Sequence, residues 1–428
     1  MAGMKLPRAI ATTEQIFLRI GLPLVLLFSI YLLGKRAIGD WYSRKGSPES
    51  LQAAIKWDGD NPQYCDALGT LTSFYMISAK FDESVASFEC ATRLSPYDAH
   101  YWSDLGAAYD RAGRPNDALS AFKRALELFP NSPEIHWRFA NFAFRTHRTS
   151  EALRALPFVL AGSSPSHRDV FRLAIRSSPD KGAILDMLPL QASVFFEFLN
   201  FEMEAGDILA AEATWRRLLQ LKLSFELRQA FPYLDALIQH HETDRMVAAW
   251  SALAERFPVE IGPLAKSPNL VENGSFEREI LDGGLDWRVV PVEGAEVSLD
   301  SVEAFEGARA LRIEFDGKSN LDYGHVFQYV PVEPNRRYRF SGAMRVKGIT
   351  TDSGLRFQVF DAFDVGKLFL STENTVGTSG WTLRQLEFKT SPATHLLVAR
   401  VARIPSQKLD NRIGGTAWID QVRLVPDN

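Results

Sequence analysis

The sequence predicts a multidomain chain with an N-terminal transmembrane helix, a central all-α array of helical repeats and a C-terminal all-β sandwich. Three observations favour this fold class. An apolar stretch lies near the N-terminus, a helix–turn–helix pattern of about 34 residues occupies the first half, and the hydrophobic period changes from 3.6 to 2 after residue 268. At 428 residues, the chain is long enough for two or three such parts.

The first 15 residues form a short tail before the apolar stretch. Ile16 to Gly34 contains one charged residue, Arg19, and nearly matches the roughly 20 residues that a helix needs to cross a bilayer. A cleaved signal peptide and a buried core helix are the alternatives. A signal peptide would end in small residues at a cleavage site, whereas Lys35 and Arg36 follow this stretch. We therefore predict one uncleaved transmembrane helix over residues 16–34.

The stretch from Ala99 to Ser132 has the side chains of one helix–turn–helix repeat. Small residues stand where two helices must approach closely, and large rings surround that contact. Gly113 stops the first helix and Pro115 opens the second. The packing residues of this repeat are Trp102, Leu105, Gly106, Tyr109, Ala118, Phe122, Ala125 and Pro130. Their spacing resembles the tetratricopeptide repeat, which implies an array of stacked helix pairs, an all-α superhelix.

The same register extends in both directions, so we predict that the array spans residues 47–258. The matching residues one period earlier are Leu68, Leu71, Tyr75, Ser84, Phe88, Ala91 and Pro96. Ser47 to Trp57 is predicted to be a lone second helix, and Trp215 and Trp250 take the position of Phe122 in two divergent later repeats. The resemblance implies that a protein partner binds in the groove of the superhelix. A spacer that only sets a distance from the membrane is the alternative.

Composition and motifs argue against several classes of function. The net charge of -4 provides no basic surface for nucleic acid. No zinc-protease helix motif, nucleophile elbow or phosphate loop appears, so we expect no enzyme activity. Two cysteines, Cys65 and Cys90, imply no disulfide framework. Packing of antiparallel helices would bring them near each other, but we expect two unpaired buried thiols.

The last third of the chain has the pattern of an antiparallel β-sandwich. Residues 259–268 carry Gly262, Pro263 and Pro268 without a helical period, so they form a predicted linker. From residue 269 to 428, apolar and polar side chains alternate in segments that are separated by turns. The side chains expected to face the core include Leu311, Ile313, Phe315, Tyr338, Phe340, Met344, Val346, Leu355, Phe357 and Val359.

Both ends of this region carry a more specific pattern. The opening segment Asn269–Glu277 and the closing segment Gly415–Leu424 resemble those of carbohydrate-binding modules with a galactose-binding-like jelly-roll fold. In that family a structural calcium ion often ties the first strand to the last. The resemblance therefore implies a calcium site, with Glu277 and Asp420 as the matching carboxylates. The alternative is that these two side chains cap turns or pair with arginines.

Five polar or aromatic side chains form the predicted glycan site. Modules of this type often bind sugar chains across the concave face of one sheet, and alternation directs side chains out of the core on three strands. The outward residues are Arg345, Arg356, Gln358, Phe360 and Arg400. If these strands are neighbours, one face combines guanidinium and amide donors with a ring, and its arginines favour an acidic polymer. A solvated face of Arg–acid pairs is the alternative.

Together these features predict a membrane-anchored, non-enzymatic scaffold that binds a protein partner and a polysaccharide, in surface polysaccharide biogenesis. The alternative is a structural envelope scaffold whose sandwich is a second protein-docking surface. Lys5 and Arg8 precede the span and four basic residues follow it closely, which weakly favours a cytoplasmic body. Glycan binding requires the opposite orientation, so we predict a body on the periplasmic side.

Overall fold

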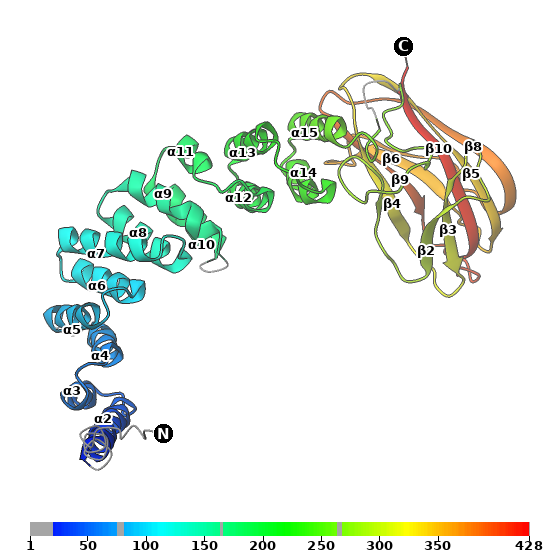
Figure 1. Cartoon of the computed structure of the whole chain (residues 1–428). Helices are drawn as coiled ribbons and strands as arrows, with labels where there is room; N and C mark the ends of the chain where they lie inside the picture. Colours follow the sequence, from blue (N-terminus) through cyan, green and yellow to red (C-terminus); the bar gives the residue numbers. More distant parts are fainter. Residues whose placement is uncertain (1–19, 75–80, 163–165, 263–267, 428) are drawn as a thin grey trace, which may run out of the picture. The chain divides into compact units, whose positions relative to one another are not determined.

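The computed structural model describes residues 20–74, 81–162, 166–262 and 268–427. The chain divides into two compact units, Met1–Glu197 and Phe198–Asn428. The first unit is helical, and the second combines helices with two antiparallel β-sheets (Figure 1). This confirms the predicted multidomain fold class of a long apolar helix, helical repeats and a β-sandwich.

The helices of the first unit follow one another with short connections. Neighbours along the chain pack as pairs, most extensively α4 with α5, α6 with α7, and α8 with α9. Their bounds are α2 (Leu22–Ser43), α3 (Pro48–Trp57), α4 (Pro62–Phe74), α5 (Phe81–Leu94), α6 (Ala99–Arg111), α7 (Pro115–Leu128), α8 (Pro133–Arg145), α9 (Thr149–Leu160), α10 (His167–Ser177), α11 (Lys181–Asp186) and α12 (Ala192–Glu204), which crosses into the second unit.

Helix α2 contains the apolar stretch and continues beyond it. Among the described residues it is the one helix that is long and apolar enough to cross a membrane, a property that a signal sequence shares. Residues 16–19 of the predicted span lie outside the described residues. The helix continues past Gly34 to Ser43, because no proline interrupts this stretch and a single glycine, Gly39, is tolerated inside a helix.

The last turns of α2 pack against α3 and α4. Gly39 is buried, with Asp58 and Tyr64 next to its Cα, and the Tyr64 hydroxyl donates a hydrogen bond to Asp40 at 2.5 Å. The prediction that residues 47–57 form a lone second helix is therefore wrong. The last turns of α2 are the partner of this helix. The sequence did not predict this contact, because the apolar pattern of α2 stops at Lys35.

The central repeat is built around the contact between α6 and α7. A Cβ atom added at Gly106 would lie 2.9 Å from the ring of Phe122, so only glycine allows this approach. Ala118, Phe122 and Ala125 are at most 1% exposed, and Leu105 is also buried. Gly113 has a φ of +72° just after α6, and Pro115 is at the start of α7. One period earlier, Gly69 contacts Phe88 in the same way, whereas Tyr75 lies outside the described residues.

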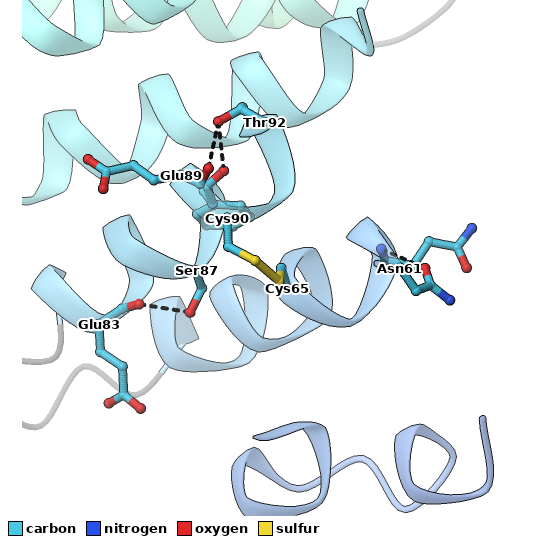
Figure 2. The surroundings of a disulfide bond; sticks show 9 residues. Asn61, Cys65, Glu83, Ser87, Glu89, Cys90 and Thr92 are labelled. Carbon is cyan, nitrogen blue, oxygen red and sulfur yellow. Dashed lines mark hydrogen bonds between the residues drawn. A yellow bond between two sulfur atoms is a disulfide. The ribbon is translucent and has the colours of Figure 1, made fainter. Parts of the chain in front are cut away.

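Cys65 in α4 and Cys90 in α5 form a disulfide bond (Figure 2). Their Cα atoms are 5.9 Å apart, within the usual range for such a bond. The expectation of two free thiols is therefore wrong. The physical reason is that α4 and α5 pack side by side, so residues separated by 25 positions in the sequence meet on facing helix surfaces.

The helices of the second unit are the end of α12, α13 (Ile208–Gln220), the 3₁₀ helix η2 (Leu227–Ala230), α14 (Phe231–Gln239) and α15 (Thr243–Arg256). Their core is aromatic: Trp215, Tyr233 and Trp250 are each at most 4% exposed, and the rings of Trp215 and Tyr233 are 5.3 Å apart. These helices belong to the same compact unit as the sandwich.

The sandwich consists of two five-stranded antiparallel sheets (Figure 1). The first sheet has the order β1-β4-β9-β6-β7, and the second has the order β2-β3-β10-β5-β8. The strand bounds are β1 (Arg288–Val289), β2 (Ala295–Asp300), β3 (Ala310–Asp316), β4 (Tyr323–Pro331), β5 (Arg337–Ile349), β6 (Arg356–Asp361), β7 (Phe369–Ser371), β8 (Gly377–Lys389), β9 (Leu396–Arg403) and β10 (Gly414–Pro426).

The core between the two sheets consists of the inward side chains of both. It includes Trp287 near β1, Phe315 of β3, Phe340 of β5, Phe357 of β6 and Val401 of β9. Each strand that contributes to this core alternates inward apolar side chains with outward ones. The outward side chains of the first sheet therefore form a separate face, which we call the outer face.

Candidate glycan-binding face

The register of the strands places three of the predicted site residues in adjacent rows of the outer face. Arg400 of β9 is paired with Gln358 of β6 on one side and with Phe327 of β4 on the other. In the next row, Val398 of β9 lies between Phe360 and Tyr329 of the same two strands. Directly paired residues of an antiparallel sheet point to the same side, so these side chains form one surface.

Arg400 is held within this surface by two contacts. Its Nε atom donates a hydrogen bond to Oε1 of Gln358 at 2.8 Å, and its guanidinium carbon lies 4.9 Å from the centre of the Phe360 ring. Burial lowers the pKa of Arg400, and the nearby Asp322 opposes this shift. The guanidinium stays protonated at neutral pH, because arginine is always charged in proteins. Gln358 is 2% exposed, so it orients Arg400 more than it meets solvent.

Arg356 lies one row further, paired with Ala402. Burial lowers the pKa of Arg356, and its Nε atom is buried without a hydrogen-bond partner among the described residues. Its Nη2 atom is 3.5 Å from the Ser353 hydroxyl. In the described part of the chain, no carboxylate lies within ion-pair distance of Arg356 or Arg400. Two partly desolvated cations on one face favour an anionic ligand.

Three further rings belong to this face, although the sequence reasoning did not single them out. Tyr329 and Phe327 are in T-shaped contact with their centres 5.7 Å apart, and Phe369 of β7 lies 6.0 Å from Phe360. Arg288 of β1 lies over Tyr329, with its guanidinium carbon 5.4 Å from the ring centre. The signal that would have found β4 is its alternation from Val326 to Val330, with aromatic side chains at the outward positions.

Arg345 is not part of this face. It lies on β5, which belongs to the second sheet, and is therefore separated from the other four residues by the core. It forms an ion pair with Glu303 and lies 5.4 Å from the centre of the Trp418 ring. The prediction that all five residues lie on one face is therefore wrong for Arg345. Alternation predicts which side chains point outward, but it does not predict which sheet a strand joins.

Glu277 and Asp420 both hold the loop before β3. Oε1 of Glu277 accepts hydrogen bonds from the amides of Ala308 and Arg309, at 2.8 and 3.2 Å. Oδ2 of Asp420 accepts from the amides of residues 305 and 306, and burial raises the pKa of its carboxyl. These four N–H donors correspond to the turn-capping alternative. Carboxylate oxygens are also ligands that calcium prefers, so the calcium site stays a prediction.

No group of three or more His, Cys, Asp or Glu side chains among the described residues is placed to hold a metal ion. Two tryptophans of the sandwich are buried. Trp287 is in the core at 1% exposure, and Trp418 is 7% exposed with its Nε1 atom donating to Asp300 at 2.8 Å. These tryptophans are therefore structural.

The first unit has a polar cluster on α4, α6 and α8, which are the first helices of three successive pairs. Arg138 of α8 pairs with Asp104 of α6 and with Glu134, and Arg145 pairs with Asp110. On α4, burial and the neighbouring Asp104 raise the pKa of Asp66 to about 6. The cluster shows that the first helices of successive repeats carry charged side chains that pair with one another.

Comparison with known proteins agrees with the two-part reading. Residues 99–132 match the model of the tetratricopeptide repeat. An 83-residue segment is 37% identical to the tetratricopeptide repeat domain-containing protein PYG7, chloroplastic, of Arabidopsis thaliana, covering 19% of this chain and 28% of that protein. This chain therefore spans less than a third of the length of that relative.

Two solved structures are similar to separate parts of the chain. Family 16 Carbohydrate Binding Module-2 is 19% identical, over 37% of this chain and 99% of that chain, with a TM-score of 0.27. MamA is 15% identical, over 43% of this chain and 94% of that chain, with a TM-score of 0.26. The helical part of the chain thus contains tetratricopeptide repeats, and a two-sheet β-sandwich follows it.

Proposed function

We propose that this protein is a membrane-anchored, non-enzymatic scaffold whose outer face binds an acidic glycan and whose helical repeats bind a protein partner, in the biogenesis of a surface polysaccharide. One observation carries the glycan proposal: two arginines and two rings lie on the same face of the first sheet. The arginines are Arg356 and Arg400, which lack an ion-pair partner among the described residues, and the rings are those of Phe360 and Tyr329. Guanidinium groups bind carboxylates, and rings provide a stacking surface for a sugar.

The test is a titration of the full-length protein in detergent with polygalacturonate and with neutral dextran. We expect binding to the acidic polymer, which weakens as ionic strength rises because the ligand charges are screened. Changing Arg356→Gln and Arg400→Gln together should abolish this binding. The control is Arg345→Gln, which removes one guanidinium group from the other sheet and should leave binding unchanged. Equal loss in the control contradicts the assignment of the face.

Absence of binding to either polymer would contradict the glycan proposal and favour the alternative, in which the sandwich is a second protein-docking surface of a structural envelope scaffold. The protein-partner proposal is supported by the tetratricopeptide repeats themselves. A photo-crosslinking side chain placed at Asp66, in the polar cluster, should capture a partner that the same side chain at the exposed Lys123 does not. Equal capture at both positions would argue against a specific surface.

We infer further that α2 anchors the protein and that the body lies on the periplasmic side. Disulfide bonds persist in oxidising compartments, so the Cys65–Cys90 bond supports this orientation against the weak charge asymmetry. Full-length protein should stay with the membrane in carbonate, and deletion of residues 1–36 should release a soluble body. A reporter fused after Asn428 that functions only when exported should be active. Activity of a reporter that functions only in the cytoplasm would reverse the topology.

A further inference from the structure

The outer face is not equally open on all sides. Three rings form a row across the strands, which we call the aromatic row: Phe369 of β7, Phe360 of β6 and Tyr329 of β4, with Val398 of β9 between the last two. At the β7 edge, Phe369 is 48% exposed and Ser371 is also exposed. A sugar chain can therefore reach the row from this side.

The row is closed at the β1 edge by Arg288. Its guanidinium lies over the Tyr329 ring and forms an ion pair with Asp235 of α14, and Nη2 also donates to the Gly284 carbonyl at 3.2 Å. The Arg288 side chain is 15% exposed. An arginine that is mostly buried and makes three contacts is held in place. Arg288 therefore occupies the face of the Tyr329 ring on which a further sugar would stack.

Helix α14 forms a rigid support behind Arg288. The backbone before β1 approaches this helix pair so closely that a Cβ atom at Gly283 would lie 2.2 Å from the Phe231 ring, and one at Gly284 would lie 2.1 Å from the Trp250 ring. At the other end of α14, the His241 ring is stacked on Phe363 at 4.0 Å, just after β6. Contacts at β1 and after β6 place the helix across this end of the sheet.

Burial along β9 shows that the end of the sheet beside the aromatic row is also covered. Leu396 has the same outward direction as Val398 and Arg400 but is 0% exposed, whereas Arg400 is partly exposed. A cavity of about 1020 Å³ lies between α13, α15 and the loops that follow β6 and β8. None of the described residues that line this cavity belongs to the outer face, so the cavity does not extend the aromatic row.

We propose that the aromatic row has one closed end, so that the outer face binds the terminal segment of a glycan chain rather than its interior. The chain enters at the β7 edge, stacks on Phe369 and Phe360, and ends at Arg288. This inference rests on the proposed glycan function and adds the class of ligand, a chain end of an acidic polysaccharide. A polymer that continued past Tyr329 would meet the Arg288–Asp235 pair and α14.

The experiment uses the full-length protein in detergent and polygalacturonate that has been partly depolymerised to several mean lengths, with short oligomers removed. The amount of protein bound per gram of polymer at saturation is measured by sedimentation. If the outer face takes chain ends, doubling the number of chains per gram doubles the amount of protein bound. If it takes chain interiors, the bound amount per gram stays constant, which overturns this inference but not the proposed function. Absence of binding at every length overturns both.

A second measurement identifies the end. Bulky groups are coupled to the reducing ends of one sample and to the non-reducing ends of another. Loss of binding in one of the two samples supports recognition of that end, and unchanged binding in both overturns the inference. Arg288→Ala opens the closed edge, so this variant should bind an amount that no longer depends on chain number. Arg345→Ala, which removes an arginine from the other sheet, serves as its control.

Discussion

The disulfide between Cys65 and Cys90 should contribute substantially to the stability of the first repeats. The bond closes a loop of 25 residues between α4 and α5. In the chain-entropy model, removing such a cross-link lowers the free energy of unfolding by about 3.5 kcal/mol at 25 °C, because the unfolded chain regains its freedom. Domain stabilities are typically about 5–15 kcal/mol, so the loss is large.

The perturbation is the double substitution Cys65→Ala and Cys90→Ala, which avoids leaving one reactive thiol. Cys65 is 2% exposed, so the loss of its buried sulfur atom adds a packing cost to the loss of the cross-link. Repeat arrays are stabilised by nearest-neighbour contacts, so the loss should be concentrated in α4 and α5. Hydrogen exchange followed by mass spectrometry should show faster exchange in these helices, and urea unfolding should show the lower stability.

Reducing the wild-type protein with dithiothreitol should reproduce the effect of the double substitution, and the reductant should have no effect on the double variant. The exposed change Lys123→Ala on α7 should alter stability by less than about 0.5 kcal/mol. The reasoning is refuted if protein isolated without reductant contains two titratable thiols. It is also refuted if the oxidised wild type and the double variant unfold at the same urea concentration.

Three further predictions concern packing, ions and pH. Gly106→Leu should destabilise the array by about 1–3 kcal/mol in thermal melts, because its Cβ atom alone would lie 2.9 Å from the Phe122 ring, and Ala118→Leu should act similarly. Equal melting temperatures for these variants and for Lys123→Ala would contradict the assignment of these residues to the contact between α6 and α7. Chelation of calcium with EDTA should leave the melting temperature of the second unit unchanged, because backbone amides already donate hydrogen bonds to Glu277 and Asp420. A rise in melting temperature on adding calcium would instead support the predicted calcium site. Burial raises the pKa of Asp286 to about 6, above its ordinary value of 3.8, so the folded state binds more protons between these values and stability should fall as pH rises through this window. Asp286→Asn should reduce that slope in urea unfolding followed from pH 4 to pH 7, with Asp66 contributing the same direction of change, and an unchanged slope in the variant would contradict the prediction.

The sequence by itself determined the features that depend on local spacing. The repeat pattern around Gly106 and Phe122 recurs because each helix pair must bury an apolar stripe at a period of 3.6. The sandwich strands were predictable because their inward side chains alternate with outward ones at a period of 2. Arg356, Gln358, Phe360 and Arg400 were found in this way, since direction relative to the core is a local property of a strand.

Only the tertiary structure decided which of these local features meet. Arg345 points out of its strand as predicted but belongs to the other sheet, because the pairing of strands depends on chain topology and not on alternation. The Cys65–Cys90 bond, the packing of α2 on α3 and the closure of the aromatic row by Arg288 join residues that are distant in the sequence. Such contacts arise from the packing of complete elements, whose positions no single stretch of sequence specifies.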